Sequence, residues 1–190
     1  QETIIYMKKQ KLVVLVDKGG NNLYFQDGEL SVMGKMEAHQ KGMLHRAISV
    51  FIFDDSDRLL IQKRTPEKYH SPSLWSNTCC THSLPGESML AAAQRCLREE
   101  LGIDALIKEP FTFLYRAEVG NGLTEYEFDH VLFGISNQDP NPNPVEVSDR
   151  YWITMDDLDQ TLVLEPEKYT PRLRSSFNTI VKQRLRRNPF

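Results

Sequence analysis

Two short stretches of the chain carry side chains that could move protons or bind a metal ion. Cys80 and His82 are two residues apart, and so are Glu125 and Glu127. In an extended strand, residues two apart lie on the same face, so each pair would present its groups together. Paired carboxylates repel, and a raised pKa or a bound metal relieves that repulsion. Both outcomes suit acid–base chemistry, whereas the plainer interpretation is a packed histidine and a solvated carboxylate pair.

A third group of charged residues lies on segment 87–101. This segment is rich in alanine and leucine and has no Gly or Pro before Gly102, which predicts a helix. Glu87 and Glu100 are 13 residues apart, which places them at nearly the same azimuth of a helix, with Arg95 near that face. Carboxylates and an arginine facing a pocket suit a hydrated divalent cation and a phosphate. The alternative is a solvated, salt-bridged helix face.

The elements that must position these groups alternate irregularly along the chain. This order favours an α/β or α+β domain over a strictly parallel sheet, and we predict one domain over residues 1–190. Residues 18–30 are rich in Gly and Asn and predict a loop, in which Asn22-Leu-Tyr-Phe-Gln26 resembles part of an engineered, non-native protease site. Strands are predicted at 11–17, 47–53, 59–63 (the hairpin partner of 47–53), 111–119, 126–136 and 151–154, and helices at 87–101, 156–162 and 171–187.

Composition narrows the class of protein. With 190 residues, 40% hydrophobic residues and 26% charged residues, the chain has the composition of a soluble globular protein. The net charge of −3 offers no basis for nucleic-acid or membrane-surface binding, and no apolar run approaches the roughly 20 residues of a membrane helix. The three cysteines predict no disulfide framework, so we expect a reducing, cytoplasmic location with Cys79 and Cys96 as inert core residues.

Aligned on Gly102, the helix segment resembles the Nudix box, whose pattern is Gly-x5-Glu-x7-Arg-Glu, an aliphatic residue, x, Glu-Glu-x-Gly and another aliphatic residue. Thr81 stands where the box opens with Gly, and Cys96 stands where a metal-binding Glu follows the Arg. The resemblance implies a Nudix-type mixed sheet sandwiched between helices. The replacement at Cys96 weighs against plain hydrolysis. The matching positions are Glu87, Arg95, Leu97, Glu99, Glu100, Gly102 and Ile103.

A second, more specific resemblance covers roughly residues 35–127. The run Trp75-Ser-Asn-Thr-Cys-Cys-Thr-His82, beside the altered box, resembles the type I isopentenyl-diphosphate isomerases, in which a cysteine commonly occupies the position of Cys96. This resemblance implies an isomerase that interconverts isopentenyl and dimethylallyl diphosphate through a tertiary carbocation. The expected partner is therefore a small isoprenyl diphosphate, without nucleic acid or membrane, and the protein is expected to be a monomer or a weak dimer.

The resemblance also implies a role for each matching residue. Cys80 and Glu127 would transfer protons on opposite faces of the isoprene unit, with Tyr115 hydrogen-bonded to Glu127 and Trp75 facing the carbocation. Two metal ions are implied. The first, a Zn²⁺, Mn²⁺ or Mg²⁺ ion, would bind to a group of histidines and glutamates. The second, a Mg²⁺ ion on the substrate diphosphate, would bind to Glu100 and the carbonyl of Cys80. The first ion would be held by His39, His45, His82, Glu125 and Glu127, and the diphosphate by Lys35, Arg64, Lys68 and Arg95.

One position departs from the isomerase pattern. Members of the family usually have a Trp after a Pro near the C-terminus, and this chain has Arg172 after Pro171. A cation beside a carbocation is unfavourable, so Arg172 must point elsewhere, another aromatic such as Tyr169 must take the role, or the activity is altered. Two alternatives to the isomerase are therefore a Nudix pyrophosphohydrolase and a diphosphate-binding regulatory module without catalysis.

Overall fold

The computed structural model describes residues 11–186. A seven-stranded mixed sheet and a small two-stranded sheet (β1-β2) carry the described helices. In chain order the elements are β1 (Leu12–Val14), β2 (Val32–Gly34), α2 (Lys35–Lys41), β3 (His45–Phe53), β4 (Leu59–Arg64), β5 (Trp75–Ser76), β6 (Cys79–Thr81), α3 (Met89–Leu101), β7 (Leu106–Glu118), β8 (Thr124–Ile135), β9 (Val147–Ile153), α4 (Met155–Leu164), a 3₁₀ turn (Pro166–Lys168) and α5 (Pro171–Arg186).

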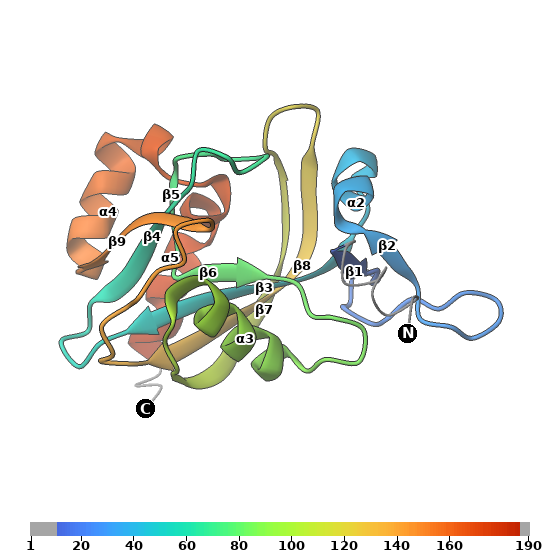
Figure 1. The fold of residues 1–190 in the computed structure, drawn as a ribbon, viewed down its shortest axis with the longest axis horizontal. Coiled ribbons are helices and arrows are strands. Elements are labelled where there is room, and N and C mark those ends of the chain that lie inside the picture. Colours follow the sequence, from blue (N-terminus) through green and yellow to red (C-terminus); the bar gives the residue numbers. More distant parts are fainter. Residues whose placement is uncertain (1–10, 187–190) are drawn as a thin grey trace.

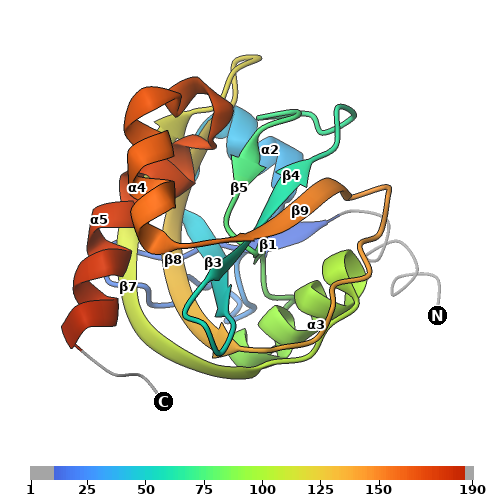
Figure 2. The ribbon, with the colours of Figure 1, turned by 90° about the vertical axis from the view of Figure 1, so that its left-hand side faces the viewer.

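The large sheet lies between helices. Its strand order is β5-β4-β3-β8-β7, with β6 added to β3 and β9 added to β4. Helix α3 covers one face of the sheet, and α4 and α5 cover the other (Figures 1 and 2). Only the central β3–β8 pair is parallel among the pairings of this sheet within the described residues. The predicted Nudix-type mixed sheet between helices is confirmed.

Strand β3 explains how one strand serves both faces. Its apolar residues alternate between the two layers, because successive side chains of a strand point to opposite faces. Ile48, Val50 and Ile52 pack with α3, whereas Phe51 and Phe53 pack with α4 and α5. All five side chains are fully buried, which accounts for the continuous apolar run in a strand that has helices on both sides.

Strand β8 places the carboxylate pair at the centre of the molecule. It lies between β3, which it pairs in parallel, and β7, which it pairs in antiparallel fashion. Glu127 is the register partner of both His45 on β3 and Tyr115 on β7. Glu125 and Glu127 are both buried and, being two residues apart, share a face of β8.

Helix α3 begins later than the predicted helix over 87–101. Its N-cap is Ser88, whose side chain accepts a hydrogen bond from the Ala91 amide at 3.2 Å, and it ends at Gly102 in the left-handed conformation (φ 64°). Glu87 therefore precedes the helix, and the inference that Glu87 and Glu100 share a helix azimuth is wrong. Instead, the Glu87 carboxylate accepts a hydrogen bond from the Leu84 amide at 2.9 Å.

The predicted hairpin of 47–53 with 59–63 is shorter in the structure than expected. The predicted partner of 47–53, β4, pairs with β3 only at Phe53 and Leu59, because β6 takes the β3 edge at Ile48–Val50. Segment 18–30 folds back on residues near β1, since the Leu23 amide donates to the Leu15 carbonyl at 3.0 Å.

No helix in residues 11–186 combines the length and apolar character that crossing a membrane requires.

Candidate active site

Three histidines and a glutamate from four separate segments of the chain meet near the start of β8. His39 comes from α2, His45 begins β3, His82 follows β6, and Glu127 lies on β8. One ligand atom from each lies within 4.8 Å of the others. His82 and His45 place Nε2 at 3.3 and 3.5 Å from Glu127 Oε1. Three imidazoles and one carboxylate are a donor set that suits Zn²⁺ and related divalent ions.

The state of these imidazoles fits a metal ion. His45 Nδ1 lies 2.7 Å from the Met43 carbonyl and must donate to it, which leaves the lone pair on Nε2. The Nε2 atoms of His39 and His45 are buried and have no hydrogen-bond partner in the described structure. Burial lowers the pKa of His39 to about 3 and lowers that of His82 well below its usual value. Buried imidazole nitrogens that gather beside a carboxylate, two of them without a hydrogen-bond partner among the described residues, suit a cation site.

Glu125, predicted as a fifth ligand, has different neighbours. Its Oε1 atom lies 3.5 Å from His70 Nε2 and 3.2 Å from an Arg172 nitrogen. Within residues 11–186 it is not part of the compact metal-binding group. Burial raises the pKa of Glu125, and the charge of Glu127 adds to that effect. As a metal ligand, Glu125 stays a prediction.

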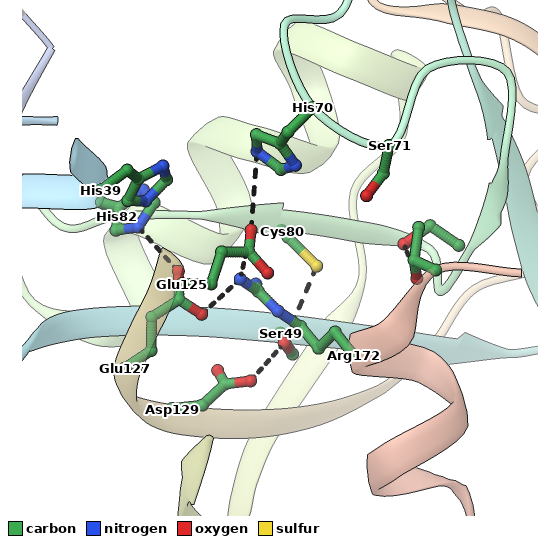
Figure 3. A network of polar contacts seen from close by, with 12 residues as sticks. His39, Ser49, His70, Ser71, Cys80, His82, Glu125, Glu127, Asp129 and Arg172 are labelled. Carbon is green, nitrogen blue, oxygen red and sulfur yellow. Dashed lines mark hydrogen bonds and ion pairs between the residues drawn. The ribbon is translucent and has the colours of Figure 1, made fainter. Parts of the chain in front are cut away.

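Cys80 lies on β6, two residues before His82. Its thiol donates to Asn77 Oδ1 at 3.2 Å and lies 3.7 Å from the Ser49 hydroxyl, which in turn donates to Asp129 Oδ2 at 2.6 Å (Figure 3). Burial raises the pKa of the Cys80 thiol to about 11. Asn77 is fully buried and its amide nitrogen donates to the carbonyls of Val50 and Cys79. The thiol is therefore held by a fixed acceptor.

Arg172 lies in the middle of the site. Its guanidinium donates to Glu127 Oε2, contacts Glu125, and lies 5.4 Å from the centre of the Tyr115 ring. Figure 3 shows Glu127 and Cys80 on either side of this guanidinium. Burial would raise the pKa of Glu127, but the charge of Arg172 and the neighbouring His45 and His82 side chains hold that pKa well below its usual range. The alternative in which Arg172 points elsewhere is wrong, because the side chain points into the site.

The two predicted aromatic residues lie in different places. The Tyr115 hydroxyl is buried beside the carboxylates but has no hydrogen-bond partner among the described residues, so the predicted bond to Glu127 is not formed in this conformation. Burial raises the pKa of Tyr115 above its ordinary value. The Trp75 ring packs edge-on against Tyr151 with centroids 4.7 Å apart and does not line the described cavity.

A cavity of about 40 Å³ lies beside Cys80, His82, Glu125 and Arg172. It has room for only a few water molecules, so the site is narrow in this conformation. Basic and hydroxyl groups dominate its wall, as expected for an anionic ligand. Its lining consists of Lys35, Arg64, His70, Ser71, Ser76, Cys80, His82, Glu125, Thr170, Pro171 and Arg172.

Only two of the four predicted diphosphate ligands line this cavity, namely Lys35 and Arg64. Arg64 also donates to the carbonyls of His70 and Ser71 at 3.0 Å each, which fixes the loop that carries them. Burial lowers the pKa of Lys35 to about 8.

The other two predicted diphosphate ligands and Glu100 lie around the cavity. Lys68 pairs with Glu146. Arg95 forms a two-point ion pair with Glu87, with both contacts at 2.9 Å. Glu100 accepts a hydrogen bond from Gln62 at 2.8 Å, and burial raises its pKa. These three roles stay predictions.

The sequence patterns missed several groups of the site. His70, Ser49, Asn77 and Asp129 are buried there. Burial raises the pKa of Asp129 to about 7. The position of Asp129 two residues after Glu127, at a third alternate place on the same strand, was a signal that could have found it. Nothing in the spacing indicated His70, which a loop brings in.

Comparisons with known proteins agree with this architecture. The Nudix domain profile matches residues 43–173. Isopentenyl-diphosphate Delta-isomerase 1 of Aromatoleum aromaticum is 48% identical over 169 residues, which cover 89% of this chain and 92% of that protein. Isopentenyl-diphosphate Delta-isomerase 2 of the same bacterium is 45% identical over 90% of this chain and 87% of its own length. The Pectobacterium atrosepticum isopentenyl-diphosphate Delta-isomerase is 45% identical, with coverages of 88% and 90%.

Solved structures show the same fold at low sequence identity. The crystal structure of DR0079 from Deinococcus radiodurans superposes with a TM-score of 0.70 at 18% identity, covering 88% of this chain and 98% of that one. The MutT protein of Methanosarcina mazei superposes with a TM-score of 0.61 at 15% identity, covering 74% and 95%. At these identities the likeness concerns the fold alone.

Proposed function

The chain belongs to the isopentenyl-diphosphate Delta-isomerase family of Nudix domain proteins, and from this premise we propose that Cys80 and Glu127 carry the protons of its reaction. The reaction interconverts isopentenyl diphosphate and dimethylallyl diphosphate, as the names of relatives that are 45–48% identical indicate. The single observation that carries the proposal is the placing of the Cys80 thiol, which lines the small cavity, and the buried Glu127 carboxylate on either side of the Arg172 guanidinium.

Cations of the cavity wall would anchor the diphosphate. Lys35 and Arg64 are the two predicted ligands that line the cavity, and a planar guanidinium can bind phosphate oxygens at two points. Lys68, Arg95 and Glu100 lie nearby and are engaged with protein partners. Binding energy from the diphosphate, which does not react, would hold the hydrocarbon in place for the proton transfers.

A divalent ion fits the group formed by His39, His45, His82 and Glu127. When bound there, it would supply positive charge that strengthens the acidity of groups beside it. The protein's own contribution is to hold Glu127 Oε1 towards the imidazoles at 3.3 and 3.5 Å. The second carboxylate oxygen remains directed towards the cavity side, where Arg172 lies.

The proton transfers balance without an oxidant or reductant. One member of the pair gives a proton to the terminal methylene carbon, and the electrons of the double bond form the new C–H bond. The tertiary carbocation that results loses a proton from the neighbouring CH₂ group to the other member, and those C–H electrons form the new double bond. The site must exclude water during this step, because water would trap the cation, and a cavity of about 40 Å³ leaves room for few water molecules beside the substrate.

The pyrophosphohydrolase alternative has little support in the structure. Cys96, which stands where the Nudix box has a metal-binding glutamate, is 2% exposed and packs in the apolar layer under α3. Its thiol donates to the Cys80 carbonyl at 3.7 Å. A buried thiol in that position offers no carboxylate to a hydrolytic metal centre.

We expect the purified protein, given isopentenyl diphosphate and Mg²⁺, to form dimethylallyl diphosphate, identified by chromatography and NMR. Pretreatment with a chelator, followed by its removal, should lower turnover by more than about 100-fold, because a catalytic metal contributes several kcal/mol to stabilisation of charge in the transition state. Adding back Mn²⁺, Zn²⁺ or Mg²⁺ singly identifies the ion. Release of inorganic phosphate or of a monophosphate ester would contradict the proposal and favour a hydrolase.

A further inference from the structure

Arg172 is a buried cation that the proton-transfer scheme does not use. It is the second residue of α5 and is 6% exposed. Helix α5 packs its apolar residues Leu173, Phe177 and Ile180 in the layer beneath the sheet. The Thr170 amide also donates to the Trp75 carbonyl at 2.9 Å, which ties the start of the helix to β5. The guanidinium is therefore delivered to the site by a fixed helix.

The contacts of Arg172 divide the oxygens of Glu127 between two partners. The guanidinium donates to Oε2, whereas His82 and His45 lie 3.3 and 3.5 Å from Oε1. The same guanidinium nitrogen lies 3.2 Å from Glu125 Oε1, which is also 3.5 Å from His70 Nε2. One side chain thus holds both carboxylates of the β8 pair (Figure 3).

The two carboxylates need such a partner because they are buried on one face of β8. Glu125 is 5% exposed and Glu127 is fully buried. Two like charges at this separation repel, and water is not available to screen them. Arg172 supplies positive charge in direct contact with both carboxylates.

We propose that Arg172 is a positioning residue, which orients Glu127 so that Oε1 faces the three histidines and pre-forms the metal-binding group. The proposal rests on the metal site of the proposed function. Partners that hold a ligating carboxylate from behind commonly change metal affinity when removed. Arginine suits this role better than lysine, because the planar guanidinium fixes the directions of its N–H groups, so that one nitrogen reaches both carboxylates, while the ammonium group acts as a point charge.

The test is a calorimetric titration of the metal-free full chain with Mn²⁺. Arg172→Lys keeps the charge and loses the fork, and we expect it to bind Mn²⁺ about 10–100-fold more weakly than the unaltered chain. Arg174→Lys is the matched control, because Arg174 is exposed on the same helix turn. This variant should bind Mn²⁺ with the affinity of the unaltered chain. Isomerase assays should show a lower kcat for Arg172→Lys with a smaller change in KM.

A second variant covers the case in which Arg172→Lys fails to fold. Glu125→Gln combined with Arg172→Met removes opposite charges together, and it should bind Mn²⁺ about 10–100-fold more weakly than Glu125→Gln alone, which separates the loss of Arg172 from any loss of Glu125 as a ligand. If Arg172→Lys binds Mn²⁺ as tightly as the unaltered chain, or more tightly, the positioning role is overturned. Such a result would mean that the guanidinium has no effect on metal binding or competes with the ion. If the unaltered chain binds no Mn²⁺, the metal site itself fails, and the role of Arg172 fails with it.

Discussion

Cys80→Ala should lower the isomerase turnover number by about 100- to 10,000-fold, the range that a positioned acid or base contributes. The variant removes the one thiol that lines the cavity and leaves the fold intact. Asn77 Oδ1, which accepts from the thiol, still accepts a hydrogen bond from the Ser76 hydroxyl at 3.1 Å. KM should change little, because the diphosphate-binding cations are untouched. Steady-state kinetics with isopentenyl diphosphate measure both constants.

Cys79→Ala is the matched control for this variant. Cys79 is the preceding residue on β6, so its side chain points to the opposite face, where it packs fully buried in the layer with α3. Its truncation should lower stability modestly and leave kcat within about twofold of the unaltered protein. If Cys80→Ala turns over as fast as Cys79→Ala, the thiol is not a proton carrier.

Glu127→Gln should have the larger effect, with a loss of turnover of more than about 1,000-fold. The amide has the shape of the carboxylate but neither its charge nor its ability to accept a proton, so one change removes a proton carrier and a metal ligand. Metal content, measured by elemental analysis of the purified variant, should fall together with activity. Circular dichroism should show an unchanged fold, because the replacement has nearly the same volume.

Glu118→Gln makes the same chemical change at an exposed position of β7 and should leave metal content and turnover unaltered. A Glu127→Gln protein that loses its metal but regains full turnover when excess metal is supplied would show that Glu127 binds metal only. That result would remove Glu127 from the proton-transfer pair and leave its metal role standing.

Much of the fold was predictable from local patterns. The β-branched run of β3, the Ala- and Leu-rich helix ending at Gly102, and the amphipathic C-terminal helix all occur near their predicted positions. The start of α3 was predicted too early although its signal is local. Glu87 follows Pro85-Gly86, and Ser88 caps the helix. The Glu87 carboxylate accepts hydrogen bonds from Arg95 and the Leu84 amide.

The site was predictable in its chemistry and less so in its membership. The spacing of Cys80, His82, Glu125 and Glu127 suggested paired groups on shared faces, but only the family resemblance assigned roles to them. Four of the five predicted metal ligands form one group in the structure. His70 reaches the site from a loop, and its contact with Glu125 spans 55 positions of sequence, so no local pattern contains that information.

Arg172 is where sequence and structure are most informative together. The sequence showed an arginine at a position where an aromatic residue was expected, and that substitution looked unfavourable beside a carbocation. The structure shows that the guanidinium is paired with both carboxylates of β8. Its positive charge is therefore largely balanced by these two carboxylates. Its position gives Arg172 a testable role in orienting Glu127.

The measurement that tests the central claim most directly is turnover of isopentenyl diphosphate by the unaltered protein in deuterium oxide, with the early product analysed by NMR. Protonation by an exchangeable side chain predicts dimethylallyl diphosphate with one deuterium in the methyl group formed from the terminal methylene. The same product without deuterium would indicate that hydrogen moves within the substrate, and a hydrolysed product would indicate a different enzyme. Either result would contradict proton transfer by Cys80 and Glu127.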